Sequence, residues 1–152
     1  MSELNVSQFL ATRLRAACDA LCESCAVMPG EAFVRPPGGA GAPGPSMADL
    51  VAECVSLNVW AAQAFRSRAA PGGLPAVPAP IADPDEAAIA LMQAANALAM
   101  TVAGFPEHLW GTHTVNRVTG EPVTWAELAD YPCQEMARSR GQADCLRRIA
   151  DL

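Results

Sequence analysis

Apolar residues recur at steps of three and four in several stretches of the chain, the spacing of one face of a helix. The first stretch runs from Val6 to Val27 and predicts a first helix there. A second stretch reaches Phe65, and it is preceded by Ser46 and Asp49, a pair suited to capping a helix N-terminus. The pattern therefore predicts a second helix that begins directly after Ser46.

Two further helices are predicted from their start signals. Asp83-Pro84-Asp85-Glu86 combines a capping side chain, a proline at the first helical position and acids at the positive end of the helix dipole, so a third helix should run from there to about Ala103. Thr124 and Glu127 have the spacing of a capping box and predict a fourth helix to Leu152. Pro132 should kink that helix in its second turn.

The connections differ in composition from the helices. Met28–Pro45 and Pro71–Pro84 are rich in proline and glycine, so we expect no regular element in either. Gly104–Pro122 carries both histidines and is predicted to be a long connection with one short turn of helix. The sequence thus predicts one all-α domain over residues 1–152, a four-helix bundle with two long Pro/Gly-rich loops.

Composition narrows the possible partners and compartment. The net charge of −6 disfavours binding to a phosphate backbone, so we expect no nucleic-acid partner. Residues 87–105 are apolar, but Gln93 and Asn96 interrupt them, which favours a buried bundle helix over a membrane span. The polar start of the chain, Ser2 to Asn5, does not resemble a secretory signal, so we expect a cytoplasmic protein with six reduced cysteines.

Polar residues interrupt two of the predicted apolar faces. Glu53 lies three residues after Leu50 and four before Leu57, on or beside the face expected to enter the core. A buried carboxylate must be protonated, paired, hydrogen-bonded or bound to a cation. In the fourth helix, the steps of three and four from Leu128 pass through Pro132, Glu135, Ser139 and Gln142.

These residues suggest an interior polar site. If the second and fourth helices are neighbours, Glu53 and Glu135 could share one proton or one metal ion. Alternatively, small tilts of the helices leave both glutamates at a solvated seam.

The same positions carry a resemblance to the DinB-like family, which includes the bacillithiol and mycothiol S-transferases. The run from Glu135 to Gln142 resembles a family helix that ends in His-His-Arg-Gly-Gln, and Arg-Gly-Gln is retained at residues 140–142. Residues 28–46 are similar to the family's passage from its first helix into its second, and residues 50–58 resemble the segment that carries its first ligand histidine. The resemblance implies an up-down-down-up four-helix bundle of the DinB/YfiT-like metalloenzyme kind and a homodimer. Gly141 in this context suggests a close approach of helices.

The resemblance also implies where a metal would bind. The family's three histidines, which bind a divalent metal such as nickel or zinc, fall on Glu53, Glu135 and Ser139. Because these are oxygen donors, any retained metal should shift towards manganese or magnesium and bind more weakly, and we expect a metal-free pocket.

Two functions follow from this arrangement. The first is a diverged protein that binds a small ligand or a partner in a pocket lined by Glu53, Glu135, Ser139 and Gln142. The second is a metal-dependent thiol S-transferase or hydrolase-like enzyme that uses Glu53 and Glu135 as ligands for manganese, nickel or zinc.

Histidine and cysteine residues offer further candidates. His108 and His113 could complete a site with the two glutamates, or they could be surface residues. Cys18, Cys22 and Cys25 are spaced to hold a soft metal, or they are buried small side chains. Two other thiols adjoin the polar residues but have no basic partner in the sequence that would lower their pKa; these are Cys54 and Cys145.

Overall fold

The computed structural model describes residues 5–36, 44–68, 78–116 and 120–150. In these ranges it contains five α-helices, one turn of 3₁₀ helix and a two-stranded hairpin. The elements are α1 (Val6–Ala26), α2 (Gly30–Val34), α3 (Met47–Ser67), α4 (Pro84–Ala103), η1 (Glu107–Leu109), β1 (His113–Asn116), β2 (Glu121–Thr124) and α5 (Trp125–Ala150). Residues 71–77 of the predicted Pro71–Pro84 loop and the last two residues of the predicted fourth helix lie outside the described residues.

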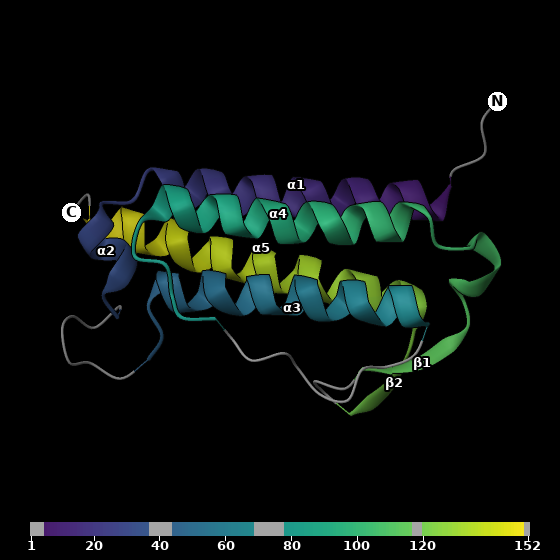
Figure 1. Ribbon diagram of the computed structural model, residues 1–152. Helices are drawn as coiled ribbons and strands as arrows, with labels where there is room; N and C mark the ends of the chain where they lie inside the picture. Colours follow the sequence, from purple (N-terminus) through teal and green to yellow (C-terminus); the bar gives the residue numbers. More distant parts are fainter. Residues whose placement is uncertain (1–4, 37–43, 69–77, 117–119, 151–152) are drawn as a thin grey trace.

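The four long helices pack as a bundle (Figure 1). α1 contacts α4 and α5, and α3 contacts the same two helices, so α1 and α3 lie diagonally opposite each other. Ser24 at the end of α1 donates a hydrogen bond to Asp144 near the end of α5, which shows that these helices run parallel. Ser7 at the start of α1 donates to the carbonyl of Phe105, just after α4, so α1 and α4 run antiparallel. α3 and α4 share one direction, opposite to that of α1 and α5.

The predicted helix starts are confirmed by their caps. The backbone N–H of Asp49 donates to Ser46 Oγ at 3.1 Å, and the N–H of Ser46 donates back to the Asp49 carboxylate at 2.9 Å. Asp83 caps α4 through the N–H of Asp85 at 2.9 Å. At α5, the reciprocal bonds of a second capping box join Thr124 and Glu127, both at 3.1 Å. Local capping chemistry therefore fixed these boundaries to within a residue or two.

The expectation of no regular element over Met28–Pro45 is wrong in part, because Gly30–Val34 forms the short helix α2. Pro29 precedes this helix as its N-cap residue, and the helix itself contains no proline. The carbonyl of Pro29 accepts the first helical hydrogen bond, from the N–H of Phe33, at 3.1 Å. α2 buries the Phe33 ring completely in the core.

The connection between α4 and α5 contains more structure than the sequence pattern predicted. Its short helical turn is present as η1, but the antiparallel hairpin β1–β2 was not predicted. The register pairs His113 with Thr124 and Asn116 with Glu121. Gly120, directly before the return strand β2, has a φ of 77°, a left-handed conformation that suits glycine. Strands of four residues give too weak an alternation to stand out in the sequence.

An aromatic cluster closes the end of the bundle next to the hairpin. Phe65 of α3 contacts three other rings, and it packs edge-to-face with Phe105 at a centroid distance of 5.1 Å. The other members are Trp110 and Trp125, both buried. Rings at these distances and tilts add to the energy of simple apolar burial.

The start of α1 is tied to the same end. The Trp110 indole N–H donates to Ser7 Oγ at 2.9 Å. Glu107 of η1 accepts hydrogen bonds from the backbone N–H groups of Ser7 at 2.9 Å and Val6 at 3.3 Å. These bonds lower the pKa of the Glu107 carboxyl. Backbone N–H groups in the first turn of α1 therefore find their hydrogen-bond acceptor in a residue about 100 positions away in sequence.

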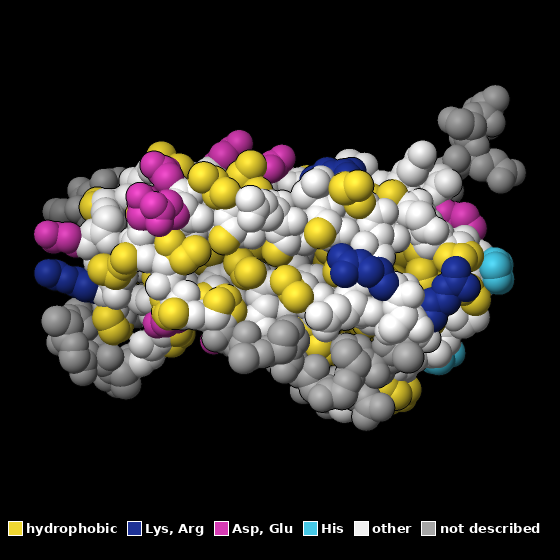
Figure 2. Space-filling model, viewed as in Figure 1, with side chains coloured by type: hydrophobic (Ala, Val, Ile, Leu, Met, Phe, Trp, Pro, Cys, Tyr) yellow, Lys and Arg dark blue, Asp and Glu magenta, His cyan; other side chains and the backbone are white. Residues whose placement is uncertain are grey.

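Within the described ranges, α4 alone is long and apolar enough, by length and composition, to cross a membrane. In the bundle it contributes Leu91, Leu98 and Val102 to the core, all fully buried. Its opposite face carries exposed apolar residues: Ile89, Met92 and Met100. Hydrophobic side chains are spread over this face of the molecule in Figure 2.

Candidate functional site

The face of α5 that enters the core includes Leu128, Pro132 and Ser139 of the predicted stripe, but not Glu135. Met136 is fully buried, whereas Glu135 lies beside it and keeps 22% of its side chain exposed. The buried positions of the helix are Trp125, Leu128, Ala129, Pro132, Cys133, Met136, Ser139 and Ala143. A methionine therefore occupies the inward position that the prediction gave to a carboxylate.

The expectation that Glu53 points into the core is wrong, because its side chain is exposed. Val59, Gln63 and Arg66 of the same helix are also exposed. This outcome matches the alternative of a solvated seam. Water is available to the Glu53 carboxylate, so the desolvation that would force it to bind a partner is absent.

Glu135 is paired within its own helix. Its carboxylate accepts a hydrogen bond from the guanidinium of Arg138, one turn further along α5. The Arg138 side chain is 64% exposed, so this pair is largely hydrated and contributes little to stability. Burial, and then the negative charge of Glu135, raise the pKa of the Tyr131 hydroxyl.

A buried polar cluster does lie between α3 and α5, but it has different members. Cys54 Sγ is 3.6 Å from the hydroxyl of Ser139. Asn58 is completely buried, and its amide donates to the Cys54 carbonyl at 2.8 Å and to Met136 Sδ at 3.8 Å. The Asn58 side-chain oxygen is buried without a hydrogen-bond partner. Of the four predicted site residues, Ser139 alone belongs to this cluster.

The surroundings of Cys54 keep its thiol protonated at neutral pH. Burial raises the pKa of Cys54 to about 11, an effect partly offset by the hydrogen bond between the thiol and Ser139. The charges of Glu135 and Glu53 raise this pKa further, and Arg138 lowers it. Both glutamates are thus close enough to act on one thiol, although neither is buried. A thiol in this state is a poor nucleophile.

A groove of about 540 Å³ runs along the seam between α3 and α5. Gln142 lines it, together with Arg138 and the exposed thiol of Cys145. The rest of its lining is mainly apolar and comprises Gly44, Pro45, Met47, Leu50, Gly141, Leu146 and Ile149. Sequence reasoning found Gln142 but placed it in the core, and it missed the apolar wall from the start of α3.

Gly141 does not mark a close contact of helices. A side-chain carbon added at this position would have no heavy atom within 4 Å. The expectation of close packing at Gly141 is therefore wrong within this chain. Instead, the glycine leaves the backbone of α5 uncovered where it borders the groove.

The three positions implied as metal ligands do not fit a preformed site. Glu53 is exposed, the Glu135 carboxylate is paired with Arg138, and the Ser139 hydroxyl faces the Cys54 thiol. Across the described ranges, no three His, Cys, Asp or Glu side chains are grouped so that they could hold a metal ion.

The histidines lie away from these residues. His113 is exposed and begins the hairpin at the end of the bundle where α3 ends, and Figure 2 shows the histidines there. Glu53 is fourteen residues before Ser67, the last residue of α3, or about 21 Å along the helix axis. His113 is therefore not placed to complete a site with Glu53.

In comparisons with known proteins, no family model matches this chain, and no curated protein matches its sequence.

Proposed function

We propose that this protein is a diverged relative of the DinB-like family that binds a small molecule in the groove between α3 and α5. The observation that carries the proposal is the groove itself. Its volume of about 540 Å³ lies in the range of known small-molecule sites. Support for the kinship comes from the antiparallel pairing of α3 with α5 and from the position of Gly141 and Gln142, two residues of the retained Arg-Gly-Gln, in the lining.

The lining favours a small apolar molecule with an acidic group. Met47, Leu50 and Leu146 offer an apolar wall. Arg138 and Gln142 supply hydrogen-bond donors at its edge, and a guanidinium suits a planar or tetrahedral anion. Because Arg138 is already paired with Glu135, an acidic ligand would share or replace that partner.

The proposal is tested with 1-anilinonaphthalene-8-sulfonate, which combines an apolar ring system with a sulfonate. We expect saturable binding at one site, measured by fluorescence titration of the native protein. Arg138→Gln removes the charge and should weaken binding about tenfold, the effect of losing one charge-assisted hydrogen bond. Leu146→Ala should also weaken it, because it removes part of the apolar wall.

Arg140→Gln is the matched control, since Arg140 is on the same helix, is similarly exposed and does not line the groove. It should bind the dye as the unaltered protein does. Equal weakening by Arg138→Gln and Arg140→Gln would mean that the dye responds to net charge alone, and the groove would lose its support.

A metal-dependent transferase or hydrolase-like enzyme is the second candidate. Its support is that two of the implied ligand positions adjoin Cys54: Glu53 precedes it in α3, and the Ser139 hydroxyl lies 3.6 Å from its sulfur. Protein purified without chelators should then contain stoichiometric manganese, nickel or zinc, which is lost in Glu53→Ala and Glu135→Ala. Metal-free protein that does not bind these ions on titration rejects this candidate.

A further inference from the structure

Two cysteine thiols of α1 lie side by side at the seam with α4. Cys18 and Cys22 are one turn apart, and their sulfur atoms are separated by 4.0 Å. The Cys22 thiol also lies 3.8 Å from the carbonyl oxygen of Ala88 on α4. Both side chains therefore face α4, on the seam of the bundle opposite to the groove between α3 and α5.

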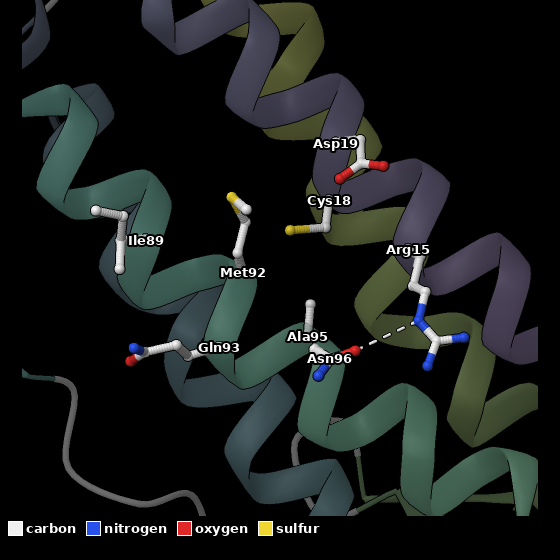
Figure 3. Close-up of a pocket in the computed structure, with 8 residues that line it drawn as sticks. All are labelled: Arg15, Cys18, Asp19, Ile89, Met92, Gln93, Ala95 and Asn96. Atoms are coloured by element: carbon white, nitrogen blue, oxygen red, sulfur yellow. Dashed lines mark hydrogen bonds between the residues drawn. The ribbon is translucent and has the colours of Figure 1, made fainter.

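A second groove, of about 370 Å³, has Cys18 in its lining, and the Cys22 sulfur lies 4.0 Å from that of Cys18, outside the lining itself. Its lining is shared by α1 and α4, and Figure 3 shows the Cys18 sulfur pointing across the groove towards the side chain of Met92. Met92 is 48% exposed, so its thioether is accessible from solvent. At the end of the groove, Arg15 donates to Asn96 at 3.4 Å, which joins the two helices.

We propose that Cys18, Cys22 and Met92 form a binding site for a soft monovalent cation, Cu(I). Thiolate and thioether sulfurs are the ligands that select Cu(I) over harder ions. Binding would form two bonds from thiolates and one from the thioether, and the two thiol protons would pass to solvent. The site is independent of the function proposed above, because it uses different residues on a different seam.

The separation of the two thiols supports a three-coordinate site. With metal–sulfur bonds of about 2.3 Å, two sulfur atoms 4.0 Å apart subtend an angle of about 120° at the metal. That is the angle of a trigonal site, which Met92 would complete from α4. A closed zinc site needs four ligands in a tetrahedron, and no third Cys, His, Asp or Glu is grouped with this pair among the described residues. The same 4.0 Å is also about twice the length of a disulfide bond.

The test is a competition for Cu(I) between the full-length protein and the chromophoric chelator bicinchoninate, under anaerobic reducing conditions. We expect the protein to withdraw one equivalent of Cu(I). Cys22→Ser should weaken this binding by at least about tenfold, since even outer-shell partners of a metal change affinity 10- to 100-fold. Met92→Leu should weaken it as well. Because the Met92 side chain is 48% exposed, this substitution should leave the protein folded, and weaker binding would then reflect the loss of the thioether.

Cys145→Ser is the matched control, because it removes an exposed thiol on α5 and leaves the pair intact. Circular dichroism shows whether each variant is folded, and the Met92→Leu result decides the matter if Cys22→Ser is not. The proposal is overturned if the native protein takes no Cu(I) from the chelator. It is also overturned if Met92→Leu binds as tightly as the native protein, or if Cys145→Ser weakens binding as much as Cys22→Ser.

Discussion

Asn58 and Ser139 are polar side chains buried between two helices, where one polar atom lacks a hydrogen-bond partner and another has a weak one. One oxygen of Asn58 has no partner, and Ser139 contacts a thiol, which is a weak hydrogen-bonding group. An unpaired buried polar atom costs roughly 1–3 kcal/mol. The unpaired atom in this cluster therefore lowers the free energy of unfolding of the protein.

The free energy of unfolding at alkaline pH should depend on the Cys54 thiol, which belongs to this cluster. Its pKa is raised from 9.0 to about 11 in the folded protein. The folded state therefore holds this proton more tightly, and the resulting stability is complete below pH 9 and is lost as pH rises towards 11. The loss amounts to at most about 1.4 kcal/mol per pH unit.

Cys54→Ala removes this titration. At pH 7 the variant should be about 1 kcal/mol less stable than the native protein in urea unfolding, because a buried sulfur is lost. By pH 11 the difference should close or change sign. A difference that stays constant from pH 7 to 11 would contradict the raised pKa.

Sequence reasoning at this scale found the region but not the residues. Ser139 and the neighbourhood of Cys54 were identified, whereas Asn58 was passed over even though it is four residues after Cys54 and four positions is one helical turn. Its burial depends on which side of α3 meets α5, and this is set by packing across the bundle.

At the scale of elements, α5 shows how well helical periodicity predicts which side chains face the core. The spacing from Leu128 allowed either Glu135 or Met136 as the next inward position. Met136 is the one that is buried, since an apolar side chain gains from burial and a carboxylate loses hydration. The pattern therefore predicted the helix, its cap and the inward position of Ser139, but it gave the inward position of Met136 to Glu135.

Gly141 lowers the stability of α5 without a packing reason in this chain, because a side-chain carbon would meet no atom within 4 Å. Gly141→Ala should stabilise the protein by about 0.5–1 kcal/mol, measured by urea unfolding. The added methyl group borders the groove, so dye binding measures its effect there separately. A loss of stability would instead indicate a contact with another molecule at this position.

The first turn of α1 depends on Glu107. Because hydrogen bonds from Ser7 and Val6 lower its pKa, the stability that it contributes is present above pH 4.5 and is lost as pH falls through the folded-state pKa. Glu107→Ala should lower the melting temperature at pH 7 and lower it less at pH 3. Gln8→Ala is the control, since the Gln8 backbone N–H, and not its side chain, joins the cap. An equal effect at both pH values would contradict this role.

For the whole molecule, the bundle and its helix boundaries were predictable from apolar spacing and caps, which are local signals. The hairpin was not, because its strands are short and it is fixed by contacts with distant parts of the chain. The aromatic cluster joins Phe65 of α3 to Trp110 and Trp125 around that hairpin. Such contacts become visible only when the helices are assembled.

The expectation of a cytoplasmic homodimer also belongs to this scale and remains a proposal. Exposed apolar residues on α4, such as Ile89 and Met100, are consistent with a covered face. Sedimentation equilibrium should give twice the chain mass of 15.8 kDa. A mass of one chain at every concentration tested would exclude the dimer.

The two grooves occupy opposite seams of the bundle, one between α1 and α4 and the other between α3 and α5. Occupants of the two could not collide, so both could be present on one molecule at once. A ligand in one groove could change the affinity of the other groove only through the packed interior of the bundle. Each ligand would then change the affinity for the other by the same factor. Cys54 and Cys18 lie in that interior, near enough for the charge of one to affect the other.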